Sequence, residues 1–436
     1  MKQQDQGEQE FAFIKEKIKD KPINKRRLLL KAVYNLLCAI VFGAAACFVF
    51  VLLKPYFEEK LYPEEESVIT IPKDVVPQEI QPASEKKEEK EPEPEPEPEK
   101  QPENQTVVVQ EQLEPEDYQE LQNKMYAIGQ QASKSLVTVT GVTSGVDWFD
   151  TPYENENSSA GIIIENNGQE LLILTEKKII ADAMAIHITF IDETEASASL
   201  KKYDGNTGIA VIAVPLSEIS EETMNQISVA VLGNSYAITQ GTSVLAIGSP
   251  LGANYSILCG TITSSQNTVS TIDTNYTIFT TDIIGNENGS GVLINLQGEV
   301  VGLVLQDYSN QSNRNTITAL SISELKQVIE DLSNNRDIPY VGLRISTVTN
   351  DIAEEYGIPK GVYIKSVELD SPAMAGGLQA ADVIIAINGE EIINSVQYYQ
   401  KIYERQPEDE ITIAVKRQIG EGYVDLECKV AVGILQ

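Results

Sequence analysis

Residues 280–304, TTDIIGNENGSGVLINLQGEVVGLV, decide how the folded part of this chain is interpreted. The runs SGVLINL and EVVGLVL are short and rich in Val, Ile and Leu, and turn residues separate them. This pattern predicts a strand, a tight turn and a second strand. Ser290 begins the first of these runs and lies in a glycine turn, between Gly289 and Gly291. The function depends on whether Ser290 attacks a substrate or only belongs to a loop.

Similar apolar runs recur on the N-terminal side of this stretch. They include SLVTVTGV, AGIIIE, LLILT, AIHITFI, GIAVIAV, TSVLAIGS, YSILCGTIT and YTIFTTDI. Many short strands at this spacing predict an antiparallel barrel or sandwich. A helical pattern begins near residue 117, and ELKQVIEDLSNN predicts a helix that ends near residue 333.

A second unit begins near Pro339. Strand-like runs such as YVGLRISTV, GVYIKSV, EITIAVKRQ and YVDLECKVAV alternate with SPAMAGGL and NSVQYYQKIYER. Strands and two short helices in so few residues predict a small α+β domain.

The composition excludes several classes of function. The 436 residues carry a formal charge of −32, from 65 acidic and 33 basic side chains. Nucleic acid is therefore an unfavourable partner, because no basic stripe replaces its counterions. The four cysteines have no metal-ligand spacing, no nucleotide fingerprint is present, and we expect no cofactor and no metal. The chain contains a single histidine, His187.

Residues 32–53, AVYNLLCAIVFGAAACFVFVLL, carry no charge and are long enough to span a bilayer as a helix. Lysines and arginines precede them and glutamates follow, which predicts a cytoplasmic N-terminus and extracytoplasmic folded domains. A cleaved signal peptide is the alternative, since Ala44-x-Ala46 resembles a cleavage site, but the apolar run is long for a signal sequence. A lipoprotein site at Cys47 is disfavoured by the small Ala44.

Residues 54–113 show no core pattern. They include SEKKEEKEPEPEPEPEKQPENQ, in which alternating Glu and Pro bury no apolar surface. Such a tract favours polyproline II and predicts a disordered acidic spacer between the membrane and the folded units.

The order of anchor, spacer, β-rich unit and small α+β unit resembles the HtrA/Deg family, over roughly residues 117–433. The residues that carry the resemblance are AIGSPLG, SILCGTIT and VLINLQGEVVGLV in the first unit, and YVGL and DSPAMAGGLQAADVIIAINGEEI in the second. The resemblance implies a mainly β fold, a trypsin-like double β-barrel followed by a PDZ domain. It divides the chain into a cytoplasmic segment (1–31), a transmembrane helix (32–53), a disordered linker (54–113), a trypsin-like protease domain (114–335) and a PDZ domain (336–436).

The catalytic triad that the resemblance implies is incomplete. The serine of the family falls on Ser290, its histidine, within LTEKKII, on Lys178, and its aspartate, within TGIAV, on Gly208. A serine hydroxyl needs a base to take its proton, and a carboxylate to orient that base. His187 lies in the alternating strand AIHITF, nine residues beyond Lys178, where we expect a structural or surface role. The loop has also lost a glycine, replaced by Asn288, and a proline, so its oxyanion hole is in doubt.

These losses predict a pseudoprotease in which Ser290 is a retained turn residue. The alternative is an active serine endopeptidase that uses Ser290 with Lys178 as an atypical base. That chemistry requires a neutral lysine, and the neighbouring Glu176 raises the pKa of Lys178 while Lys177 lowers it.

The PDZ resemblance implies a groove for peptide ends or unfolded segments. Its carboxylate loop falls on Tyr340, Val341, Gly342 and Leu343, its receiving strand begins with Arg344 and Ile345, and its facing helix offers Val396 and Tyr399. A plain core role for these apolar side chains is the alternative, above all for Val396. The resemblance further implies protein quality control at the cell membrane, with a homotrimer or a pairing with an active relative as partners.

Overall fold

The computed structural model describes residues 33–49 except 35 and 46, 68–75, 114–146, 152–309, 314–420 and 422–435, with the backbone alone at 145–146 and 152–155. The described residues of 33–49 are helical. Within the described part of the chain, no helix is long and apolar enough to span a bilayer. The predicted segment 1–31, the ends of the predicted span and most of the predicted linker lie outside the described residues.

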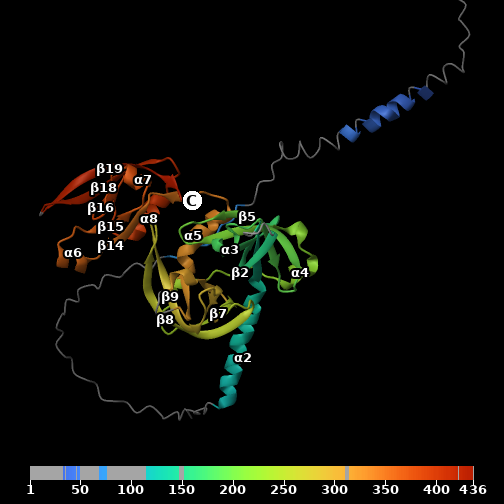
Figure 1. Cartoon of the computed structure of the whole chain (residues 1–436), viewed down its shortest axis with the longest axis horizontal. Helices are drawn as coiled ribbons and strands as arrows, with labels where there is room; N and C mark the ends of the chain where they lie inside the picture. The colour runs from blue at the N-terminus through green and yellow to red at the C-terminus, as the bar shows by residue number, and fades with distance from the viewer. Residues whose placement is uncertain are drawn as a thin grey trace, which may run out of the picture. The chain divides into compact units, whose positions relative to one another are not determined.

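Two closed antiparallel barrels form the first folded domain, as predicted (Figure 1). In sheet order, the first barrel contains β1 (Leu136–Val146), β2 (Pro152–Asn166), β3 (Glu170–Glu176), β6 (Ile209–Pro215), β5 (Glu195–Tyr203) and β4 (Ala185–Thr189). The second contains β10 (Ser290–Ile294), β11 (Val300–Leu305), β12 (Thr316–Ser321), β9 (Asn275–Ile284), β8 (Ser256–Ser270) and β7 (Ser243–Ser249).

Helices precede, connect and follow the barrel strands. They are α2 (Pro115–Ala132), α3 (Lys177–Ile180), α4 (Glu221–Gln226) and α5 (Ile322–Ser333). The predicted end of α5 near residue 333 is confirmed.

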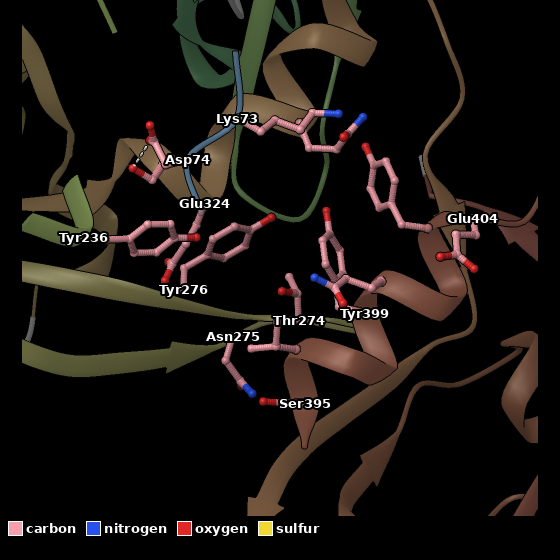
Figure 2. Close-up of a pocket in the computed structure, with 15 residues that line it drawn as sticks. Lys73, Asp74, Tyr236, Thr274, Asn275, Tyr276, Glu324, Ser395, Tyr399 and Glu404 are labelled. Carbon is pink, nitrogen blue, oxygen red and sulfur yellow. Dashed lines mark hydrogen bonds between the residues drawn. The ribbon is translucent and has the colours of Figure 1, made fainter. Parts of the chain in front are cut away.

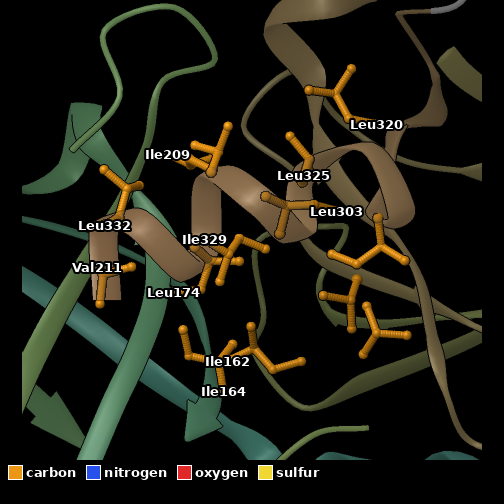
Figure 3. Close-up of a cluster of buried hydrophobic side chains, with 14 of the residues drawn as sticks. Ile162, Ile164, Leu174, Ile209, Val211, Leu303, Leu320, Leu325, Ile329 and Leu332 are labelled. Atoms are coloured by element: carbon orange, nitrogen blue, oxygen red, sulfur yellow. The ribbon is translucent and has the colours of Figure 1, made fainter. Parts of the chain in front are cut away.

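The apolar face of α5 joins the two barrels. Leu325, Ile329 and Leu332 are fully buried on this helix, in one cluster with Leu174 from β3 and Leu303 from β11 (Figure 3). Burying a leucine or isoleucine contributes roughly 1.5–3 kcal/mol. The repeat of apolar residues every three or four positions in α5 therefore closes a core shared by both barrels.

The second domain is the predicted small α+β unit. Its main sheet has the order β14 (Leu343–Val348), β15 (Gly361–Val367), β16 (Val383–Ile387), β18 (Glu410–Ile419) and β19 (Gly422–Ala431), with β17 (Glu390–Glu391) paired to β16. A separate short ladder joins β13 (Pro339–Tyr340) to β20 (Gly433–Ile434). The helices are α6 (Asn350–Tyr356), α7 (Pro372–Ala375) and α8 (Ser395–Tyr403), so the prediction of two helices missed α6.

Residues 68–75 correct the prediction that 54–113 contains no packed segment. Ile69 and Ile71 are buried in the core cluster that contains α5. Asn334 bonds both the N–H and the C=O of Ile69, at 2.9 and 2.8 Å, and Glu330 accepts the N–H of Ile71 at 3.0 Å. The isoleucines of SVITIP alternate, which is the spacing of an extended segment with one buried side. This alternation indicates a packed segment, but the highly charged residues around it led to the prediction of a disordered linker.

Candidate functional site

Ser290 is the first residue of β10, so the prediction that it is a turn residue is wrong. Its side chain is 3% exposed. Its Oγ accepts a hydrogen bond from the backbone N–H of Ala160 in β2 of the other barrel, at 3.0 Å. Ser290 therefore connects the two barrels through a buried hydrogen bond.

The loop before Ser290 is stabilised by its own hydrogen bonds. The N–H of Asn288 donates to Asn286 Oδ1 at 3.0 Å, and the N–H of Gly289 donates to Asn286 O at 2.9 Å. An oxyanion hole needs backbone N–H groups directed at the developing charge. In the trypsin-like arrangement these groups belong to the serine and to the residue two before it, here Asn288, and the N–H of Asn288 is directed at Asn286 instead.

Glycine is required on both sides of Ser290 because the chain approaches its neighbours closely. A Cβ on Gly291 would lie 2.1 Å from the carbonyl oxygen of Ile247, and Gly291 has a φ of +125°. A Cβ on Gly289 would lie 2.8 Å from the carbonyl oxygen of Pro250. The glycines therefore follow from packing against β7, whether or not the serine reacts.

Lys178 forms salt bridges with two carboxylates. Its Nζ lies 2.6 Å from Glu176 Oε2 and 3.6 Å from Asp307 Oδ1. Burial alone would lower the pKa of Lys178, but the hydrogen bond and charge of Glu176, with a contribution from Asp307, raise it above the ordinary lysine value. The direction predicted from Glu176 in the sequence is thus confirmed. Among the described residues, no hydrogen bond joins Ser290 to Lys178 or to His187.

Glu176 stands at the end of β3, where Ser159 Oγ donates to its Oε1 at 3.3 Å. Burial raises the pKa of Glu176, and the hydrogen bond and charge of Lys178 oppose this rise. The carboxylates of Glu176 and Asp307 both lie close to the ammonium of Lys178, and their negative charges favour its protonated form. A protonated ammonium has no lone pair with which to accept a proton from a hydroxyl.

The position of the family aspartate is occupied by a backbone turn. Gly208 has a φ of +77°, and its carbonyl accepts the N–H of Lys177 at 2.8 Å. The neighbouring Asp204 accepts hydrogen bonds from Thr207, and burial raises the pKa of Asp204 against these bonds. His187 lies on β4 opposite Thr140 and Ser197.

The predicted PDZ loop brings together the backbone N–H groups of Val341, Gly342 and Leu343. All three donate to the carboxylate of Asp273, at 2.7, 2.8 and 3.0 Å. Gly342 has a φ of +97°, and a Cβ there would lie 2.3 Å from Ser371 Cβ. Asp273 was not among the predicted site residues, because it lies 69 residues from Gly342 in the chain.

The predicted receiving strand follows this loop. Leu343 and Ile345 are buried, while Arg344 is partly exposed and its Nε bonds Glu368 at 2.8 Å. Tyr340 pairs with Gly433 in the short β13–β20 ladder.

Val396 and Tyr399 of α8 line a cavity of about 500 Å³ between the PDZ domain and the second barrel (Figure 2). Val396 is 44% exposed, so the alternative of a plain core residue is wrong for it. Lys73 and Asp74 of the 68–75 segment line the same cavity, as do Thr274 and Asn275 at the start of β9. The cavity therefore joins three parts of the chain that are distant in sequence.

Comparison with known proteins agrees with these two domains. Residues 159–303 match the family model of a trypsin-like peptidase domain, and residues 339–431 match that of a PDZ domain. A probable periplasmic serine endoprotease, DegP-like, from Hahella chejuensis is 30% identical over 283 residues, which cover 63% of this chain and 58% of that protein. The chain is therefore similar to HtrA-type proteases, in which a trypsin-like peptidase domain precedes a PDZ domain.

Two further HtrA-type proteins show the extent of this similarity. A probable DegP-like endoprotease of Pseudomonas savastanoi is 32% identical over 252 residues, 56% of this chain and 50% of that protein. The chain thus spans little more than half the length of these curated relatives. The solved structure "HtrA-type protease AlgW with decapeptide" covers 71% of this chain and 98% of its own, with a TM-score of 0.54 and 21% identity, and it supports the fold.

Proposed function

We propose that this HtrA-type protein is a pseudoprotease that binds peptide ends or misfolded segments without cutting them. The observation that carries the proposal is the salt bridge of Lys178 with Glu176, at the position where the family histidine stands. It holds a proton on the side chain that occupies the position of the base. The buried Ser290 hydroxyl and the occupied N–H group of Asn288 support the same conclusion.

The binding function rests on the PDZ domain. A PDZ groove adds a peptide as an extra strand and receives its carboxylate on backbone N–H groups. The convergence of three such groups on one carboxylate supports this chemistry at Val341, Gly342 and Leu343. The similar AlgW protease was solved with a decapeptide, which also supports peptides as ligands.

We place the folded domains outside the cytoplasm, attached through a membrane anchor at 32–53. The support is the uncharged stretch itself, the basic residues before it, and the periplasmic location named for the relatives. In this position the protein would act in envelope quality control. It would do so either as a homotrimer without other proteins or by regulating an active relative. Exposed Tyr118 and Tyr126 on α2 are available for such contacts.

The test compares the full chain in detergent with its Ser290→Ala variant. We expect no cleavage of fluorescent casein above the rate of Ser290→Ala, and no labelling by a serine-directed phosphonate. An active HtrA protease in the same detergent serves as the positive control. Labelling or cleavage that Ser290→Ala abolishes would instead establish an endopeptidase that uses Ser290, with Lys178 as the base to test next.

A further inference from the structure

The turn between β8 and β9 presents a carboxylate to the PDZ domain. Asp273 lies at this turn with a φ of +58°, and its side chain is buried. Its Oδ2 accepts the N–H groups of Val341 and Gly342, and its Oδ1 accepts the N–H of Leu343 and the hydroxyl of Tyr398, at 2.8 Å for the last. Both carboxylate oxygens therefore have two donors each.

The residues around Asp273 also form hydrogen bonds with the receiving strand of the PDZ domain. The N–H of Asp273 donates to the carbonyl of Leu343 at 2.6 Å. Arg344 Nη1 donates to the carbonyl of Ser270 at 3.0 Å, and Ser270 Oγ donates to the carbonyl of Ile345 at 3.3 Å. A carboxylate on the loop together with backbone contacts along the strand is the bonding that a peptide end would make.

We propose that Asp273 is an internal ligand of the PDZ domain, so that a partner chain must displace the β8–β9 turn before its own C-terminal carboxylate binds. The inference rests on the proposed peptide-binding function and adds its regulation. In the closed arrangement the loop has no free N–H group for a second carboxylate, since Val341, Gly342 and Leu343 all donate to Asp273. The partner is a protein chain that ends in a free carboxylate.

The adjacent cavity provides space for the side chains of such a chain. It is bounded by Thr274 and Asn275 of the β8–β9 region and by Val396 and Tyr399 of α8 (Figure 2). Displacement of the turn would leave Val396 and Tyr399 as an apolar wall beside the emptied carboxylate loop. We therefore expect partners whose last residues are apolar.

The displaced turn is also connected to the first barrel. The side chain of Asn206 accepts the N–H of Ile272 at 2.9 Å and donates to the carbonyl of Ile272 at 2.8 Å. Asn206 lies two residues before Gly208, the position of the family aspartate. Peptide binding that displaces the turn would therefore break the hydrogen bonds between Ile272 and Asn206, next to the protease site.

The experiment measures peptide affinity of the full chain in detergent. The probe is a mixture of dye-labelled decapeptides that end in Val, Leu or Phe, and the readout is fluorescence anisotropy. When the competent state is rarely populated, the apparent dissociation constant rises by the inverse of its population. We expect Asp273→Ala to tighten binding by about tenfold or more, and Asp273→Asn to tighten it in the same direction.

Two controls distinguish tighter binding caused by the loss of the Asp273 carboxylate from tighter binding caused by a general destabilisation of the fold. Asp192→Ala removes a turn aspartate of the first barrel that bonds Thr194 and Thr223, and it should leave the affinity unchanged. We expect Asp273→Ala to bind the same peptides with amidated ends no more tightly than the wild type does. A gain that survives amidation would overturn competition for the carboxylate loop.

Two other outcomes distinguish this inference from the proposed function. If wild type and both Asp273 variants bind the free-carboxylate peptides equally well, Asp273 is no competitor, while peptide binding stands. If none of the three binds any peptide although their circular dichroism spectra match, peptide binding itself is wrong and the inference falls with it.

Discussion

Lys178 changes the chemistry of the protease site more than the absence of a histidine alone would. A neutral residue at this position would leave the buried Glu176 without a charged partner. The lysine supplies that partner at 2.6 Å, and this ion pair is the basis of the proposed loss of proton transfer. Breaking a buried pair by removing one member leaves an uncompensated charge.

We predict that Lys178→Met lowers the free energy of unfolding by about 1 kcal/mol at pH 7, since it removes a charged hydrogen bond from the buried Glu176, while solvent screens the exposed ammonium in part. The folded-state pKa of Lys178 is raised, so its stabilisation is fully present below the ordinary lysine value of 10.5 and is lost as the pH rises through the folded value. The difference between wild type and variant should therefore shrink above about pH 10.5.

Urea unfolding of both proteins at pH 7 and pH 11 measures this difference. Lys124→Met is the control, because its ion pair with Glu120 lies on the exposed surface of α2, where solvent screens it, and its removal should leave the stability almost unchanged. A Lys178→Met difference that is equally large at both pH values would refute the raised pKa.

At the scale of elements, the packing of residues 68–75 against α5 connects the chain before the barrels to the core. Asp74 Oδ2 accepts hydrogen bonds from Ser323 Oγ at 2.5 Å and from Lys326 Nζ at 2.8 Å. Lys326 is 3% exposed, and Asp74 is the acidic partner in its ion pair. A buried ammonium without a partner is costly.

We predict that Asp74→Ala lowers the free energy of unfolding by about 3 kcal/mol, because it leaves Lys326 charged, buried and unpaired. Lys73→Ala is the matched control, with a half-exposed side chain 4.0 Å from Glu330 and an expected effect under about 0.5 kcal/mol. The double variant Asp74→Ala/Lys326→Met should recover most of the loss. Equal effects of Asp74→Ala and Lys73→Ala in urea unfolding would contradict the packing of this segment.

At the scale of the whole molecule, the PDZ domain and the second barrel are joined by buried polar contacts. Asp273 contributes most of them, and burial raises its pKa although its hydrogen-bond donors oppose the rise. The hydroxyl of Tyr403 in α8 also donates to Asp331 of α5. Removing one partner of a buried hydrogen bond leaves the other unsatisfied, so each domain stabilises the other.

We predict a single calorimetric unfolding transition for the barrels and the PDZ domain in the full chain. In Asp273→Ala this transition should divide in two, since the link between the domains is weakened. Asp425→Ala is the control, because its ion pair with Lys416 joins two strands within the PDZ sheet. Two transitions already present in the wild type would show that the domains unfold independently.

Much of the fold and part of the site could be predicted from the sequence, because they depend on local patterns. The alternating apolar runs specify strands with one buried face, and the repeat in ELKQVIEDL specifies the packed face of α5. The resemblance to the family predicts that Lys178 and Gly208 stand at the positions of its histidine and aspartate, and the neighbouring Glu176 predicts a raised pKa of Lys178. The PDZ loop was placed by its motif, and its N–H groups do converge on a carboxylate.

Only the tertiary structure decided which distant groups meet. Ser290 reaches Ala160 across 130 residues, Asp273 reaches Gly342 across 69, and Asp74 reaches Lys326 across 252. No local pattern encodes such pairs, because each is created when separate elements close on a shared core. The sequence by itself determined the strands, the domains and the missing triad members. The buried state of Ser290 and the occupied PDZ loop follow from packing, which removes these groups from water and makes them form hydrogen bonds with one another. The ion pair of Lys178 follows from the burial of its partner Glu176.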